Sequence, residues 1–165
     1  MKDFILALIA RLELKCPSLH INEWNNQLAQ MNEGEQMTFP LPSAFIEIIS
    51  DTPKIQLGNG VQLYDPLTVR IHILHEKYNE NGYFYRDLDV FDTKQDVYLA
   101  LQKFEPLNAS TFVCISETQD NDHANVYHFM IDFATNLMDF SAKEPRNPLT
   151  VQPPFTYNIN ANLTK

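Results

Sequence analysis

Two apolar segments that alternate with period two, one on each side of a compact turn, constrain the fold of this chain most. The first covers residues 44–49 and the second residues 69–74, and β-branched residues are frequent in both. Such alternation is typical of β-strands. Residues 58–60 between them read Gly-Asn-Gly, and because glycine and asparagine adopt positive φ easily, they predict a tight turn. We therefore predict that residues 37–76 form two strands of an elaborated β-hairpin.

Two other segments have the apolar spacing of amphipathic helices. Residues 2–14 carry one broad apolar stripe, which stops before Pro17. Residues 93–104 carry a similar stripe, and Asp92 or Thr93 is suited to cap the start of that helix. Both helices are expected to pack on the predicted sheet.

The second half of the chain adds another pair of strands. Residues 111–117 and 126–133 alternate apolar and polar side chains around a polar turn, which predicts an antiparallel hairpin. The order of elements predicts an α+β fold: a mostly antiparallel β-sheet with two principal helices packed on one face. We expect residues 1–165 to form a single domain, in which residues 139–165 are an extended, proline-rich C-terminal arm.

Composition argues against several functional classes. The net charge is −9, which disfavours sequence-independent nucleic-acid binding and attachment to anionic membranes, since both depend on Lys and Arg. The apolar N-terminus contains Asp3, Arg11 and Glu13, which fits neither a signal peptide nor a membrane span. Cys16 and Cys114 form no CxxC motif, and we expect them to be buried free thiols.

The motifs of catalysis and cofactor binding are not found, so we predict a non-enzyme with no cofactor and no metal. There is no phosphate-binding glycine loop and no GxSxG elbow. His72 and His75 are three residues apart, which places them on opposite faces of a regular strand. A loose group of possible metal ligands lies around the second turn, but a polar hairpin tip is the preferred interpretation. This group is Asp120, Asp122, His123 and His128.

Several residues are instead suited to contacts with other proteins. Glu47 is unusual among apolar neighbours, and we expect it to face solvent or another subunit, or to pair with Arg70 or His72. Trp24 is the only tryptophan and is either a core aromatic or an interface anchor. The aromatic loop 77–89 either folds back on the core or forms a contact surface. The candidate interface residues are Trp24, Phe39, Pro40, Pro42, Glu47, Tyr83, Phe84, Tyr85, Pro153 and Pro154.

Four segments together resemble the tail-terminator, or tail-completion, proteins of bacteriophages, in particular small versions from phages and prophages of Bacteroides-like hosts. The segments are LHINEWNNQ, FPLPSAFIEI with the glycine turn that follows it, VRIHILHE, and FDTKQDVYLALQKF. The resemblance covers roughly residues 18–135. It implies an antiparallel sheet flanked by helices, and six copies in a ring that caps the tail tube and joins it to the head.

What the resemblance implies is a structural virion protein of the tail or neck, assembled in the cytoplasm of a bacterial host. Its partners would be further copies of itself in a hexameric ring, the tail tube and the neck or head connector. DNA would only pass through an acidic lumen. The proline-rich arm departs from the compact family pattern, which leaves open another neck ring or a head-completion protein. The alternative is an acidic binding or immunity-type protein that neutralises a basic partner.

Overall fold

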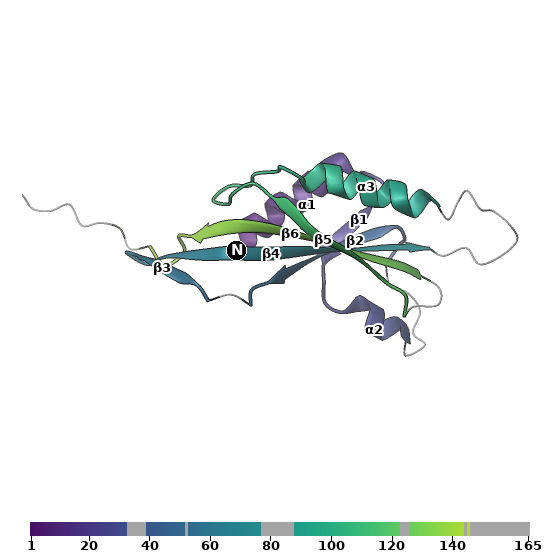
Figure 1. The fold of residues 1–165 in the computed structure, drawn as a ribbon, viewed down its shortest axis with the longest axis horizontal. Helices are drawn as coiled ribbons and strands as arrows, with labels where there is room; N and C mark the ends of the chain where they lie inside the picture. Colours follow the sequence, from purple (N-terminus) through teal and green to yellow (C-terminus); the bar gives the residue numbers. More distant parts are fainter. Residues whose placement is uncertain (33–38, 52, 77–87, 123–125, 144, 146–165) are drawn as a thin grey trace, which may run out of the picture.

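A mixed β-sheet forms the centre of the molecule, and helices lie on both sides of it (Figure 1). The structure is a computed structural model that describes residues 1–32, 39–51, 53–76, 88–122, 126–143 and 145. The helices are α1 (Lys2–Lys15), α2 (Gln27–Asn32) and α3 (Asp89–Leu101). The strands are β1 (His20–Glu23), β2 (Ser43–Ile49), β3 (Ile55–Gly58), β4 (Val61–Glu76), β5 (Val113–Asp120) and β6 (Val126–Asp139).

The strand order is β1-β2-β4-β6-β5, and β3 pairs with β4 outside this path. β1 runs parallel to β2, and the other described pairs are antiparallel. The α+β class with a mostly antiparallel sheet is therefore confirmed. The sequence left a short strand open at residues 19–24, but the parallel pairing of β1 was not predicted, because its four residues are too few to show a clear alternation.

The predicted turn is present, and it joins β3 to β4. Gly58, Asn59 and Gly60 all have positive φ, at 94°, 50° and 75°. β2 then pairs with the second half of β4, as expected for an elaborated hairpin. β4 is 16 residues long and continues through Pro66 because its pairing with β6 shifts register there. Such an irregularity accommodates a residue that has no N–H to donate.

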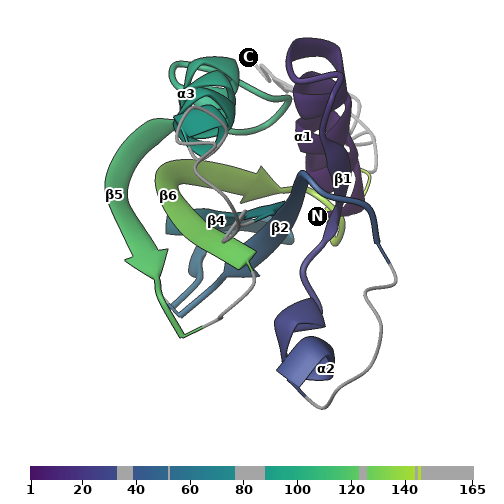
Figure 2. The ribbon, with the colours of Figure 1, turned by 90° about the vertical axis from the view of Figure 1, so that its right-hand side faces the viewer.

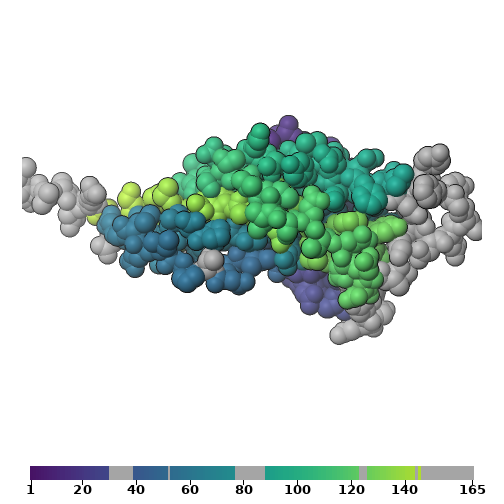
Figure 3. Space-filling view, viewed as in Figure 1, coloured from purple at the N-terminus to yellow at the C-terminus, as the bar shows by residue number. Residues whose placement is uncertain are grey.

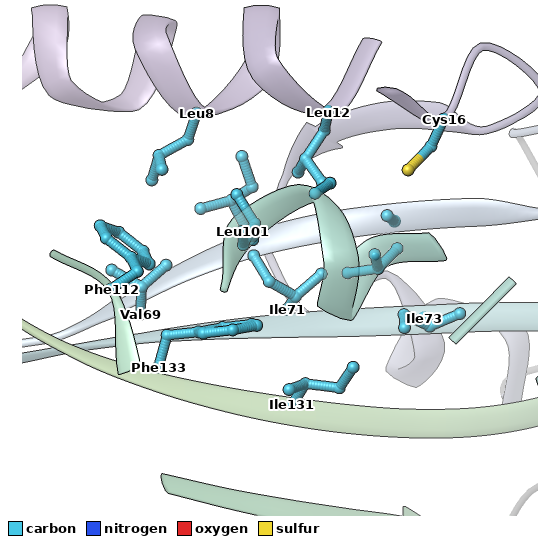
Figure 4. Close-up of a cluster of buried hydrophobic side chains, with 14 of the residues drawn as sticks. Leu8, Leu12, Cys16, Val69, Ile71, Ile73, Leu101, Phe112, Ile131 and Phe133 are labelled. Atoms are coloured by element: carbon cyan, nitrogen blue, oxygen red, sulfur yellow. The ribbon is translucent and has the colours of Figure 1, made fainter. Parts of the chain in front are cut away.

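α1 and α3 lie side by side over one face of the sheet, which we call the helical face (Figure 2). Leu8 and Leu12 of α1 and Leu101 of α3 point towards Ile71 and Phe133 of the sheet (Figure 4). All five side chains are fully buried. The two predicted helical stripes and their packing on one face are confirmed.

Some predicted boundaries were wrong. α3 begins at Asp89 rather than near Thr93, so the side-chain cap expected at Asp92 or Thr93 is not there; the N-cap residue is Leu88. The helix ends at Leu101 rather than 104, and Lys103 turns the chain with a φ of 63°. β6 continues beyond residue 133 to Asp139, because the long β4 offers it a partner along its whole length.

α2 lies on the opposite side of the sheet from α1 and α3 (Figure 2). This opposite face, which we call the second face, carries a smaller apolar cluster. This second-face cluster consists of Leu28, Phe45, Leu74 and Val126. α2 was not predicted, because its six residues are mostly polar. Within the described ranges, no helix is both long enough and apolar enough to cross a membrane.

Candidate functional site

Polar side chains from four neighbouring strands meet on the second face, beside the apolar cluster. Residues of one face are two positions apart in a strand, so Arg70 and His72 of β4 share the second face with Glu47 of β2. The register places Arg70 opposite both Glu47 and Asp132. The same register sets His128 of β6 opposite Leu74, next to His72. The sheet pairing thus concentrates titratable groups that are far apart in the sequence.

Four side chains of this face form one continuous line of hydrogen bonds, which we call the histidine row: Glu47 of β2, His72 of β4, His128 of β6 and Asp120 of β5. Glu47 Oε2 lies 3.0 Å from His72 Nε2. His72 Nδ1 lies 2.9 Å from His128 Nε2, and His128 Nδ1 lies 3.1 Å from Asp120 Oδ2. Both histidines therefore use both ring nitrogens, and each end of the row is a carboxylate.

An ion pair runs beside the row. The guanidinium of Arg70 donates from Nε and Nη2 to the two carboxylate oxygens of Asp132, at 2.8 and 3.0 Å. Ser116 Oγ donates to the same carboxylate at 3.0 Å. These bonds, above all those from Arg70, hold the pKa of Asp132 below its usual value. Nη1 of Arg70 also lies 3.8 Å from Glu47 Oε2, which links the ion pair to the row.

The indole of Trp24 covers the centre of the row. Its ring is stacked on the imidazole of His72 with a centroid distance of 3.8 Å and an interplanar angle of 4°. It also lies over His128, at 5.9 Å and 19°. Burial is the largest cause that lowers the pKa of His72, to about 4, and the charges of His128 and Arg70 act in the same direction. The hydrogen bond to Glu47 opposes this shift.

The two histidines of the row are buried, and its two carboxylates are partly exposed to solvent. The side chain of His72 is 4% exposed, whereas that of Glu47 is 33% exposed. His128 and Asp120 show the same contrast at the other end. The row therefore meets solvent mainly through its two terminal carboxylates. Among the described residues, no group of three or more His, Cys, Asp or Glu side chains is placed to hold a metal ion.

Five of the ten predicted interface residues lie in the part of the chain that the structure describes. Trp24 and Phe39 are half-buried and pack against the second-face cluster. Pro40 is exposed and Pro42 is half-buried directly before β2. Glu47 pairs with both His72 and Arg70, as one of the predicted alternatives stated. The other candidates lie outside the described residues: Tyr83, Phe84, Tyr85, Pro153 and Pro154.

Other predicted features of the site have mixed outcomes. His72 and His75 lie on opposite faces of β4, as expected: His72 is in the row, and His75 is opposite Tyr127, which packs on the helical core. Of the suggested ligand group at the second turn, Asp120 and His128 do contact each other, and His123 lies outside the described residues. The two cysteines are free thiols, of which Cys16 is buried and Cys114 only half-buried.

Sequence reasoning missed the contact between His72 and His128. Alternation alone shows that Arg70 and His72 share a face, and that His128 and Asp132 share a face. It does not show that β4 and β6 are neighbours, and the two strand pairs were treated separately. A pairing of β4 with β6 in the observed register would have revealed both the row and the ion pair.

The fold and the site define the chain as an α+β protein with a row of hydrogen-bonded histidines and carboxylates on its second face. No protein-family model matches the chain, and no curated protein matches it significantly.

Proposed function

We propose that this protein is a structural component of a bacteriophage virion, a tail terminator or related neck ring that caps the tail tube and joins it to the head. The resemblance of the sequence to that family supplies the kind of assembly. The resemblance implies an antiparallel sheet flanked by helices, and the mostly antiparallel sheet with helices on both sides of it supports the proposal. The net charge of −9 suits a lumen through which DNA slides without binding.

The single observation that carries the assembly role is the exposed edge strand β5. It is the last strand in the sheet order and pairs with β6 on one side. It lies at the surface in the space-filling view (Figure 3). Val113 and Ile115 in this strand are 51% and 56% exposed. An edge strand with exposed apolar side chains readily pairs with another chain, so β5 is our candidate contact between copies.

A ring needs a heterologous contact, in which one surface of a copy meets a different surface of the next copy. β5 lies at one edge of the sheet, and the four-residue β1 lies at the other. Two different edges are compatible with a head-to-tail arrangement. An isologous pairing of β5 with β5 would give a closed dimer and would contradict the proposed ring.

The assembly role is tested by native mass spectrometry and negative-stain electron microscopy of the purified full chain. We expect wild-type rings, and we expect Ile115→Lys to reduce them to monomers because it places a charge in the contact. The matched control is Leu99→Lys, since Leu99 is 61% exposed on α3, outside the edge. Assembly that survives Ile115→Lys unchanged, or a dimer in place of a ring, would contradict β5 as the ring contact.

The phage context is tested separately by sequencing the DNA that flanks the gene. Neighbouring genes for a tail-tube protein, a tape-measure protein or a head–tail connector would support the tail-terminator role. A neighbouring gene for a basic toxin would contradict it and would favour the immunity-type alternative, in which the acidic chain binds one basic partner tightly.

A further inference from the structure

The hydrogen bonds of the histidine row require a definite number of protons. Each of its three contacts joins two atoms at 2.9 to 3.1 Å and needs one proton between them. If both carboxylates are ionised, they can only accept, so His72 Nε2 and His128 Nδ1 must donate. The central contact needs a third proton. Two neutral imidazoles carry one N–H each, so they leave one of the three contacts without a proton.

We propose that the histidine row is a proton-binding site, which at neutral pH holds one proton more than two neutral histidines, carried by His128 as an imidazolium. In this state His128 donates to Asp120 and to His72 Nδ1, and His72 donates from Nε2 to Glu47. All three contacts are then hydrogen bonds, and both carboxylates remain ionised. This proton site is independent of the proposed assembly role.

The charges around the row favour His128 over His72 as the cation. Arg70 lies 3.8 Å from Glu47 Oε2 and already balances part of the negative charge at that end. Arg70 itself is held by Asp132 at 2.8 Å. His128 in contrast directly contacts the carboxylate of Asp120. The other described histidine on this face, His20 of β1, contacts Phe45 and is not part of the row.

The geometry of the row also disfavours a state in which both histidines are protonated. If both imidazoles were cationic, His72 Nδ1 and His128 Nε2 would be two donors only 2.9 Å apart. In agreement, burial and then the charge of His128 lower the pKa of His72, to about 4. One additional proton therefore satisfies the row, whereas none leaves a contact open and two break the central contact.

This proton count gives the contribution of the two histidines to stability a maximum with pH. An unperturbed histidine titrates at about 6.5. Above that value only the folded row holds the additional proton, so stability falls as the pH rises through the release of this proton. Below it, the unfolded chain protonates both histidines while the folded row still takes one. The histidine contribution to stability therefore also falls as the pH drops from about 6.5 towards about 4.

The direct test is nuclear magnetic resonance of the full chain with ¹⁵N-labelled histidine, in which two-bond ¹H–¹⁵N correlations distinguish imidazolium from each neutral tautomer. At neutral pH we expect an imidazolium pattern for His128 and a neutral Nε2–H pattern for His72. Neutral patterns for both residues would overturn the proposal, whether the third proton is absent or lies on a carboxylate.

A matched pair of variants tests why the proton is held. Asp120→Asn removes the carboxylate that contacts His128, and we expect the pH of proton release to fall by about one to three units, as for loss of a close opposite charge. Asp122→Asn removes an exposed carboxylate two residues away and should shift the release far less. Equal shifts in the two variants would show a general charge effect and would overturn the proposed site.

Trp24 provides an independent readout on the wild-type protein. It is the only tryptophan, and its ring centroid lies 5.9 Å from that of His128, so that its fluorescence is quenched more strongly when this nearby imidazole is protonated than when it is neutral. We expect its fluorescence to rise as the pH is raised through the release seen by magnetic resonance. The control is His75→Gln, which changes the opposite face of β4 and should leave this transition in place. A flat profile in the wild type would contradict the site.

Discussion

Asp132 is the side chain through which three strands of the second face are linked. It lies in β6 and accepts two hydrogen bonds from Arg70 in β4 and one from Ser116 in β5. Its side chain is largely buried and that of Arg70 is about one-third exposed. A two-pronged bond between guanidinium and carboxylate in such a setting is stronger than a bond between neutral groups. Removal of the charge on Asp132 would leave Arg70 without its main partner.

We therefore expect Asp132→Asn to lower the free energy of unfolding by about 1 to 3 kcal/mol, the typical cost of losing hydrogen bonds to a charged group. Chemical denaturation followed by circular dichroism measures this change. Asp51→Asn is the control, because Asp51 is exposed in the chain after β2 and should change stability by less than about 0.5 kcal/mol. Equal effects of the two substitutions would mean that the ion pair contributes nothing to stability.

The turn between β3 and β4 contains two glycines that look alike in sequence and differ in the fold. Both have positive φ, so alanine is strained at either position by about 1 to 2 kcal/mol. At Gly58 an added Cβ would have nothing within 4 Å. At Gly60 it would overlap the backbone carbonyl of Ala142, in the segment that follows β6. Gly60 thus lets the start of β4 lie close to the segment that follows β6.

At this element we expect Gly60→Ala to cost about 1 to 3 kcal/mol more than Gly58→Ala, because the backbone around Ala142 must move in addition to the shared conformational strain. Thermal or chemical unfolding of the two variants side by side measures the difference. Both glycines lie in the same hairpin and both have positive φ, so Gly58→Ala serves as the control for Gly60→Ala. A smaller or absent difference would show that the 140–143 segment yields at little cost.

The elements that the sequence predicted correctly are those whose pattern is local. The stripe of α1 and the alternation of β2 and β4 repeat within ten or so residues, and the alternation was sufficient to suggest that Glu47 pairs with Arg70 or His72. The pairing of β4 with β6 joins residues about 60 positions apart, such as Arg70 and Asp132. No local pattern encodes such a pairing, which is why His128 and Asp120 were not assigned to the row.

For the whole molecule, the two faces of the sheet have different roles. The helical face holds the main core, where side chains such as Leu8, Leu101 and Phe133 are inaccessible to solvent. The second face has a much smaller apolar cluster, and the histidine row and the ion pair between Arg70 and Asp132 lie beside it. Hydrophobic burial on the helical face supplies most of the stability. The second face is consequently the part of the fold in which charged and titratable groups contribute most of the side-chain contacts.

The net charge of −9 per copy makes the two candidate functions respond to salt in opposite directions. Copies of one acidic chain repel each other, and salt screens this repulsion, since the Debye length falls from about 10 Å at 0.1 M to about 3 Å at 1 M ionic strength. The ring should therefore dissociate less at high salt. An acidic protein that neutralises a basic partner should instead bind more weakly, because screening removes the attraction. Sedimentation velocity of the full chain alone, at these two ionic strengths, measures the effect on self-assembly. Rings that weaken with salt would mean that specific ion pairs, rather than the apolar edge of β5, hold the copies together.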